Sequence, residues 1–367
     1  MVQQKTSLHK YFENFPDHRV NRQKKHLISD IIILAILATI CGAESWDSIE
    51  EFGKTKQSFL KTFLKLPNGI PSHDTINRVF AAIRPKLFET LFAGWAGSLK
   101  NEDIKKEVIS FDGKCIKGSK DSFYHQNPIY MVSAWASENQ LVLGQLKVDE
   151  KSNEITAIPL LLELLEIEGS IITIDAIGTQ TQIAEKIIEQ KADYILSVKG
   201  NQKELLEQVE SRFIRQKPEG TDETLEKGHG RIDTRRCEVI TNLKYLDCRE
   251  NWAGIQSIIK ITSHRDTGKK QETETRFYIS SLLDNAQNFN KFIRQHWGIE
   301  NKVHWTLDVV FDEDRQRKRT KNAAQNFSFV RKIAINLLKK DKSKGSLVTK
   351  RLKAGWDDSF LLQLLEN

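Results

Sequence analysis

The sequence predicts an α/β protein in which a mixed sheet with flanking helices follows a small helical domain. Three observations lead to this prediction. Apolar residues recur at helical spacing up to about residue 98, the period becomes extended near residue 106, and strand-like and helix-like segments alternate beyond that point. The chain has 367 residues, of which 39% are hydrophobic and 29% charged. This composition is ordinary for a globular protein and excludes collagen-like, mucin-like and wholly disordered chains.

Residues 1–98 are expected to be mostly helical. The apolar segment from Leu27 to Cys41 predicts one helix, and Ser45 is a possible N-cap of a second, since serine is a preferred N-cap. The segment from Ser72 to Thr75 predicts the start of another helix. The apolar run is shorter than the roughly 18 residues that span a bilayer, and it lies too far into the chain for a signal peptide. We therefore expect no membrane partner. A small helical domain of this kind is interpreted as one that binds DNA or another protein, with plain packing as the alternative.

Residues 105–340 are predicted to hold the main sheet. Two segments form a predicted antiparallel hairpin, Ile129 to Ala136 and Leu141 to Val148. The other predicted elements are a strand at Val108 to Phe111, a helix at Glu154 to Ile167, a strand at Ile171 to Asp175, a helix at Thr179 to Gln190 and a strand at Tyr194 to Val198. An antiparallel start followed by parallel α/β units is the succession expected of a ribonuclease-H-like core. Residues from about 220 to 282 alternate in polarity and predict a β-rich insertion, and helical spacing returns at Phe289.

The chain carries 56 Lys and Arg against 49 Asp and Glu, a net charge of +7. Between Arg315 and Lys353 there are 14 basic residues and one acidic residue. We interpret this region, with a basic C-terminal tail at 341–367, as a phosphate-binding surface, because neutralised phosphates release condensed counterions. A solvated terminal helix is the alternative. The four cysteines form no CxxC pair, which predicts reduced thiols and a cytoplasmic protein.

Two aspartates occupy positions where a buried sheet would ordinarily be apolar. Asp112 follows the apolar strand ending at Phe111, and Asp175 ends the strand that begins at Ile171. An ionised carboxylate at such a place is costly unless a cation, a metal or several donors compensate it. The pair therefore indicates a metal site, although either aspartate alone could form a turn or cap a helix.

Glu300 is the third acid in an unusual place. It lies on the apolar stripe that Phe289 and Trp297 predict for this helix, so a carboxylate is expected to face the core side. His296 and His304 stand four residues before and after Glu300 on the same helical face. The three could ligate zinc, or Glu300 could be a paired structural acid. The third interpretation joins Glu300 to the two aspartates as an all-oxygen site for two Mg²⁺ ions, with Mn²⁺ as a substitute.

The sequence resembles the DDE transposases of bacterial insertion sequences related to the IS4 group, most closely the ISAs1-like transposases and their H-repeat-associated relatives. The resemblance covers nearly the whole chain. It rests on short blocks at 111–114, 117–119, 175–180, 198–202 and 229–231, and above all on the long block from His296 to Val309.

This resemblance implies a ribonuclease-H-like catalytic core with a β-rich insertion and a helical N-terminal associated domain. It implies a catalytic triad of Asp112, Asp175 and Glu300 that holds two Mg²⁺ ions. With these ions the protein would cleave DNA strands at element ends and transfer the 3′-hydroxyl into target DNA. The partners it implies are the terminal repeats and target DNA, bound by a homodimer on paired ends. A nucleoid-associated protein of the bacterial cytoplasm follows.

The chain departs from the wider IS4 pattern around the glutamate. Ile293, His296 and Leu307 stand where that group has Tyr, Arg and Lys, so the phosphate contacts usually assigned to the Arg and Lys need substitutes. The candidates for DNA contact are Lys114, Lys199, Asn201, His229, Arg231, Arg294, His296 and His304. Two other functions stay open: a catalytically inactive, transposase-derived DNA-binding protein, and another nuclease with a ribonuclease-H-like fold.

Overall fold

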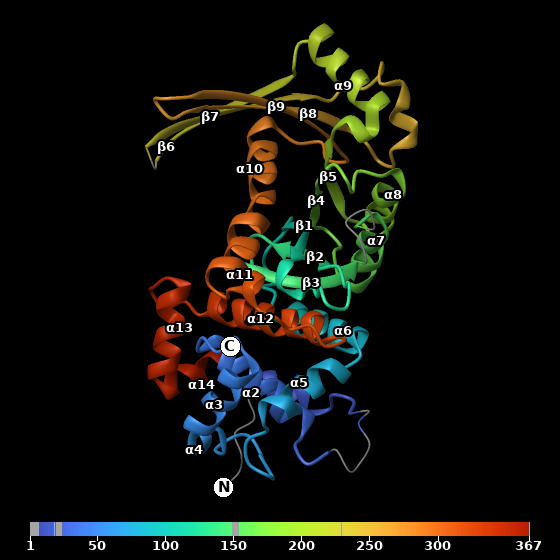
Figure 1. Cartoon of the computed structure of the whole chain (residues 1–367). Helices are drawn as coiled ribbons and strands as arrows, with labels where there is room; N and C mark the ends of the chain where they lie inside the picture. Colours follow the sequence, from blue (N-terminus) through green and yellow to red (C-terminus); the bar gives the residue numbers. More distant parts are fainter. Residues whose placement is uncertain (1–6, 18, 20–23, 149–153, 229, 367) are drawn as a thin grey trace.

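The computed structural model describes residues 7–17, 19, 24–148, 154–228 and 230–366. A nine-stranded sheet runs through the molecule in the order β3-β2-β1-β4-β5-β9-β8-β7-β6. Its strands are β1 Val108–Ile116, β2 Ile129–Ala136, β3 Leu141–Val148, β4 Ile171–Ile174, β5 Asp193–Val198, β6 Gly220–Gly228, β7 Arg231–Ile240, β8 Ser257–Asp266 and β9 Gln271–Ser280. In Figure 1, β6 to β9 project from one end of the molecule and the N-terminal helices form the other end.

The first five strands confirm the predicted mixed α/β fold. β1, β2 and β3 are antiparallel neighbours, and β4 and β5 then continue the sheet in parallel with β1. Helices α7 Glu154–Leu164 and α8 Thr181–Glu189 connect the parallel strands. The hairpin of β2 and β3 has the bounds that alternation in the sequence predicts.

The predicted β-rich insertion consists of β6 to β9, which form antiparallel pairs with one another. It is no separate sheet, because β9 pairs with β5 through Ile195 to Val198 and so extends the main sheet. An additional helix that the sequence pattern did not predict, α9 Lys203–Arg215, leads from β5 into the insertion. Helix α10 Ala286–His296 follows β9 and contacts both β1 and the insertion strands.

The N-terminal residues are helical, as predicted. Their helices are α1 Ser7–Glu13, α2 Ile28–Ile40, α3 Trp46–Thr55, α4 Gln57–Leu60, α5 His73–Ala82 and α6 Pro85–Ser98. Ser45 and Ser72 cap α3 and α5 by accepting hydrogen bonds from backbone N–H groups three residues on. Every residue of α2 is buried, yet no helix in the described ranges is long and apolar enough to cross a membrane.

The chain's last helices return to the N-terminal ones. These are α11 Trp305–Val309, α12 Ala323–Lys340, α13 Leu347–Trp356 and α14 Asp358–Glu366. Helix α12 packs against α2, α5 and α6 on one side and β3 on the other. One hydrophobic core consequently runs from the N-terminal helices into the sheet, across the predicted boundary at residues 98–105.

The interpretation of residues 315–353 as a phosphate-binding surface is wrong for several of its cations, because they are buried. Lys318, Arg331, Lys332, Lys350 and Arg351 expose at most 8% of their surface. Arg331 and Arg351 pair with Glu44, which lies outside the stretch, and Lys350 pairs with Asp341 within it. Part of the positive charge of this stretch is therefore internal, and the exposed part is Arg315, Arg317, Lys321, Lys342, Lys344 and Lys353.

Candidate active site

Asp112 and Asp175 lie side by side on neighbouring parallel strands. The register pairs Phe111 of β1 with Ile174, the last residue of β4, so Asp112 and Asp175 are the next residues along the two chain segments. The prediction that Asp112 ends its strand is wrong. Asp112 lies within β1, which continues along β2 to Ile116. A backbone N–H from Gly113 reaches Asp112 Oδ1 at 2.9 Å, and one from Ile177 reaches Asp175 Oδ1 at 3.1 Å.

The surroundings of Asp112 make its ionised form unfavourable. Burial raises the pKa of Asp112 to about 7, and the charges of Asp175 and Glu300 contribute to the increase. A further contribution comes from Glu154, at the start of α7. Within the described ranges, neither aspartate nor Glu300 forms an ion pair with a lysine or arginine. The structure therefore gathers negative charge here without a matching protein cation.

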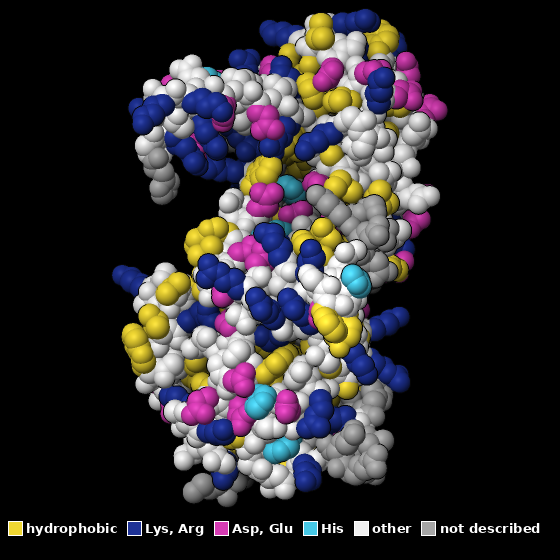
Figure 2. All heavy atoms as spheres, viewed as in Figure 1, with side chains coloured by type: hydrophobic (Ala, Val, Ile, Leu, Met, Phe, Trp, Pro, Cys, Tyr) yellow, Lys and Arg dark blue, Asp and Glu magenta, His cyan; other side chains and the backbone are white. Residues whose placement is uncertain are grey.

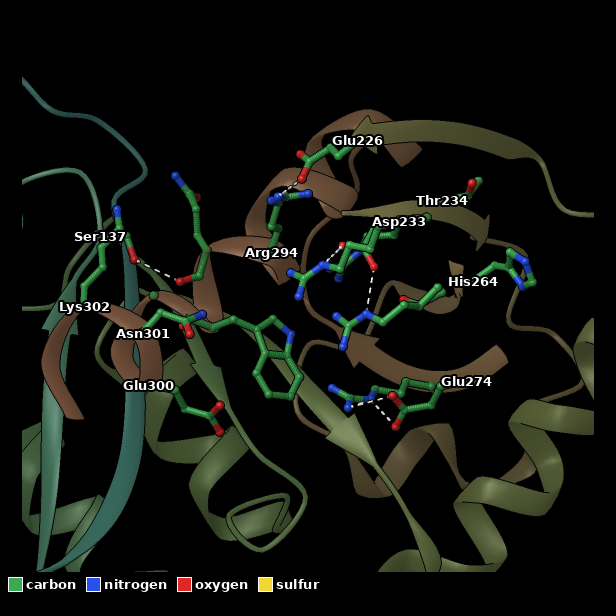
Figure 3. Close-up of a pocket in the computed structure, with 18 of the residues that line it drawn as sticks. Ser137, Glu226, Asp233, Thr234, His264, Glu274, Arg294, Glu300, Asn301 and Lys302 are labelled. Atoms are coloured by element: carbon green, nitrogen blue, oxygen red, sulfur yellow. Dashed lines mark hydrogen bonds and ion pairs between the residues drawn. The ribbon is translucent and has the colours of Figure 1, made fainter. Parts of the chain in front are cut away.

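Glu300 is exposed, contrary to the prediction that it faces the core side. The predicted continuous helix is interrupted after α10, and a π-helical turn occupies Glu300–His304. Ile299 and Val303 take the buried positions, which directs the adjacent Glu300 outward. Glu300 lines a large groove (Figure 3), and its charge is close enough to contribute to the raised pKa of Asp112, after burial and the charge of Asp175.

The two predicted histidines point inward and are uncharged. His304 Nδ1 lies 3.4 Å from Asp112 Oδ2, and His296 Nδ1 lies 2.9 Å from Thr173 Oγ1. Burial lowers the pKa of His304 to about 3, helped by the nearby cations Lys332 and Lys114. Burial likewise lowers the pKa of His296 to about 4. Neither ring compensates the carboxylate charge near neutral pH.

Glu154 is a fourth acid that the sequence analysis did not single out. It exposes only 5% of its surface, and a Cβ added at Gly113 would come within 2.2 Å of its Oε1 atom. The glycine therefore lets this carboxylate approach the strand next to Asp112. An acid in the first turn of a helix is common, so no sequence signal distinguished Glu154.

The donors at this place fit a hard divalent cation, because Asp112, Asp175 and Glu300 offer carboxylate oxygens that no lysine or arginine of the described ranges pairs with. Among the described residues, no three His, Cys, Asp or Glu side chains are gathered closely enough to enclose a metal ion. This holds for the three acids and equally for the alternative set of His296, Glu300 and His304. The acids approach one another without forming a closed ligand set.

Comparison with known proteins identifies the family. The model of the "Transposase DDE domain" matches residues 103–337, and that of the DDE_Tnp_1-associated domain matches residues 9–96. The chain belongs to the DDE transposase family. An Escherichia coli (strain K12) protein provisionally named as an H repeat-associated transposase, YhhI, is 43% identical over 362 residues, covering 95% of each chain.

A second relative, from Escherichia coli O157:H7 and provisionally named as the transposase YncI, is 40% identical over 369 residues, covering 98% of this chain and 94% of its own. The solved structure of the piggyBac transposase synaptic complex with hairpin DNA has a TM-score of 0.43 and 11% identity, covering 98% of this chain and 77% of that one.

Lys114, a predicted DNA contact in this family member, is engaged inside the protein. Its ammonium lies 2.8 Å from Asp308 Oδ1, 3.0 Å from Glu313 Oε2 and 3.4 Å from Asp314 Oδ1. Burial alone would lower the pKa of Lys114, but the carboxylates of Glu313 and Asp308 outweigh it and raise the pKa. DNA contact by Lys114 would require an exchange of these ion pairs.

Four other predicted DNA contacts occupy varied surroundings. Lys199 is exposed, whereas the Asn201 amide donates to the Ala176 carbonyl and so supports the loop after Asp175. Arg231 and Arg294 line the groove and are paired with acids. The remaining candidate, His229, lies outside the described residues.

The groove lies between the insertion strands and α10, with a volume of about 950 Å³. Its rim includes Glu300, Trp297 and the end of the β2–β3 hairpin. Arginines also line it: Arg231, Arg235, Arg265, Arg276 and Arg294. In Figure 2, Lys and Arg side chains gather on the underside of the projecting strands, facing a hollow. The groove thus joins a row of cations to one of the three acids.

Proposed function

We propose that this chain is a DNA transposase that cleaves phosphodiester bonds at insertion-sequence ends and transfers the freed 3′-hydroxyl into target DNA. The observation that carries the proposal is the neighbouring placement of Asp112 and Asp175, with the charge of Glu300 close enough to raise the pKa of Asp112. Membership of the DDE transposase family supports DNA as the substrate.

The three acids would hold two divalent metal ions, Mg²⁺ in the first place. When bound, such ions activate the attacking water or 3′-hydroxyl and stabilise the leaving oxygen. Asp112 and Asp175 are held by their strands and by backbone N–H groups, so they supply a fixed edge of the site. Glu300 reaches the site from the border of the groove, where a bound DNA strand would meet it.

His304 would position Asp112. Because its ring is neutral, the Nδ1 atom facing Asp112 can carry the proton and donate to Oδ2, which leaves Oδ1 directed by the Gly113 N–H. His296 acts in the same way on the neighbouring strand by bonding to Thr173. Both rings therefore support the strands that carry the two aspartates and move no proton themselves.

The proposal is tested by cleavage of a DNA fragment carrying the inverted repeat that flanks the reading frame. Wild-type protein in Mg²⁺ should nick the fragment and leave a 3′-hydroxyl. We expect Asp112→Asn, Asp175→Asn and Glu300→Gln each to lower the rate by about a thousandfold or more, because the acids act as a unit. DNA binding should survive in all three variants.

The control is Glu274→Gln, which removes an acid from the same groove, where Glu274 is paired with Arg276. Its cleavage should remain within a few-fold of wild type. Retained cleavage in any of the three acid variants would contradict the assignment. Salt-sensitive binding of the fragment without nicking by wild-type protein in Mg²⁺ or Mn²⁺ would favour the alternative of an inactive DNA-binding protein.

A further inference from the structure

Arg235 differs from the other arginines of the groove because no acid of the described residues forms an ion pair with it. Its Nε atom is buried and has no hydrogen-bond partner among the described residues. By contrast, Arg231 and Arg265 both bind Asp233, at 2.7 and 2.8 Å. A buried donor without a partner costs free energy, so an acceptor bound at this side chain would be stabilising.

The residues around Arg235 add positive charge to its surroundings. Arg276 and Arg294 are close enough to lower the pKa of Arg235, an effect that adds to the larger one of burial. Each of these two already has an acid: Arg276 binds Glu274 through two nitrogens, and Arg294 binds Glu226. The largest contribution that raises the pKa of Arg235 comes from Tyr278, whose hydroxyl is uncharged near neutral pH. Around Arg235 itself, positive charge is not balanced.

Arg235 and the next residue of β7, Arg236, lie in different surroundings. Arg235 lines the groove, as Asp233 and Thr234 before it do, whereas Arg236 does not. Arg236 instead lies 3.6 Å from Glu238. The chain thus places two adjacent arginines in opposite settings, one paired outside the groove and one unpaired within it.

A guanidinium with free donors beside two further arginines suits an anion with several acceptor oxygens, and phosphate is the usual one. Arg276 is also fixed over the Trp297 ring at 4.3 Å, which holds it at the groove wall. Glu300 lines the same groove. A strand whose phosphate lay at Arg235 could therefore extend along the groove to the proposed cleavage site.

We propose that Arg235, with Arg276 and Arg294 beside it, binds a backbone phosphate of the DNA strand that enters the groove towards Glu300. This inference rests on the proposed function, since it assigns a phosphate-binding position for the same substrate. Arg235 is a positioning residue, because its guanidinium would hold the strand and not the reacting bond. The contact is to the backbone, so it would be independent of DNA sequence.

The test measures binding of a fluorescein-labelled, random-sequence DNA duplex across a series of NaCl concentrations, without divalent metal so that no cleavage occurs. Arg235→Gln should weaken binding about tenfold, and the slope of log affinity against log salt should become shallower by about 0.9, the value for one phosphate contact. Arg236→Gln is the matched control, which removes the same charge one residue away and should stay within twofold of wild type.

Arg235→Lys separates lost charge from a damaged fold. It should keep the wild-type salt slope, because the ammonium can still neutralise a phosphate, and it should bind more weakly than wild type since it lacks the planar fork. A reduced slope in this variant too would overturn the inference. So would wild-type behaviour of Arg235→Gln, or an equal loss in Arg236→Gln.

These outcomes separate the inference from the proposed function. If wild-type protein binds the duplex in a salt-sensitive way and Arg235→Gln binds equally well, only the role of Arg235 is overturned. If wild-type protein shows no salt-sensitive DNA binding at all, both the inference and the proposed function fail. Retained cleavage in the acid variants, by contrast, would overturn the catalytic assignment and leave the Arg235 measurement unaffected.

Discussion

Asp112 and Glu313 are both largely removed from water and both adjoin β1, yet their pKa values move in opposite directions. Burial and neighbouring acids raise the pKa of Asp112 to about 7. Burial alone would also raise the pKa of Glu313, but three cations outweigh it and lower the pKa to about 2: Lys114, Lys332 and Arg331. The difference lies in the partners and not in the degree of burial.

The Glu313 network joins distant parts of the chain. Arg331 of α12 lies 3.5 Å from Glu313 Oε1 and 3.2 Å from Glu44 Oε2, while Arg351 of α13 lies 3.0 Å from Glu44 Oε1. These pairs connect β1, the C-terminal helices and the N-terminal region. A buried charge cluster that the protein neutralises itself holds the elements together, whereas the proposed function assigns a ligand to the cluster at Asp112.

The largest stability effect is expected at Glu313. Glu313→Gln should lower the free energy of unfolding by about 3 to 5 kcal/mol, because it leaves Lys114 and Arg331 buried beside a neutral group. Urea unfolding measures this change. The matched control is Glu51→Gln, whose acid is 72% exposed and 3.9 Å from Lys54, and which should change stability by no more than about 0.5 kcal/mol. Equal effects of the two substitutions would refute the contrast drawn here.

A smaller, pH-dependent effect is expected at Asp112. The folded-state pKa of Asp112, about 7, lies above the ordinary value of 3.8, so its contribution to stability is complete below about pH 4 and is lost as the pH rises through 7. Without metal, wild-type protein should therefore lose stability relative to Asp112→Asn between pH 5 and 8, by on the order of 2 kcal/mol. Unfolding free energies of both proteins at the two pH values provide the measurement. A pH-independent difference between them would show that Asp112 is not so perturbed.

The smallest effect concerns the histidine beside Asp112. His304→Ala should reduce the cleavage rate about tenfold, because residues that orient metal-binding side chains typically contribute that much. His304→Asn, which can still donate a hydrogen bond to Asp112, should retain most of the rate. Since the pKa of His304 is lowered to about 3, the pH profile between 5.5 and 8 should contain no step from this ring. A step near pH 6.5 that disappears in His304→Asn would contradict this role.

Much of the fold could be predicted because its signals are local. Residue spacing predicts the β2–β3 hairpin, the cap at Ser45 and the helix start at Ser72. It also predicts the two strands that lead to Asp112 and Asp175. The strand pairing between β5 and β9 could not be predicted in this way, since it joins segments some 80 residues apart.

The site was predicted less completely, and for physical reasons. The outward direction of Glu300 depends on a π-helical turn, which a regular helical period cannot reveal. Glu154 and Glu313 resemble ordinary surface acids in the sequence. The prediction for the basic stretch is wrong in part, because a count of cations does not reveal that Arg331 and Arg351 pair with Glu44, 287 and 307 residues away.

The central claim is that the unneutralised carboxylates, and not the neutralised ones, bind divalent metal. The most direct measurement is the thermal unfolding of wild type, Asp112→Asn and Glu313→Gln at pH 8, with and without Mg²⁺. Mg²⁺ should stabilise wild type and Glu313→Gln, since a ligand of the folded state raises its stability, and it should not stabilise Asp112→Asn. Equal stabilisation of Asp112→Asn and wild type would contradict the claim.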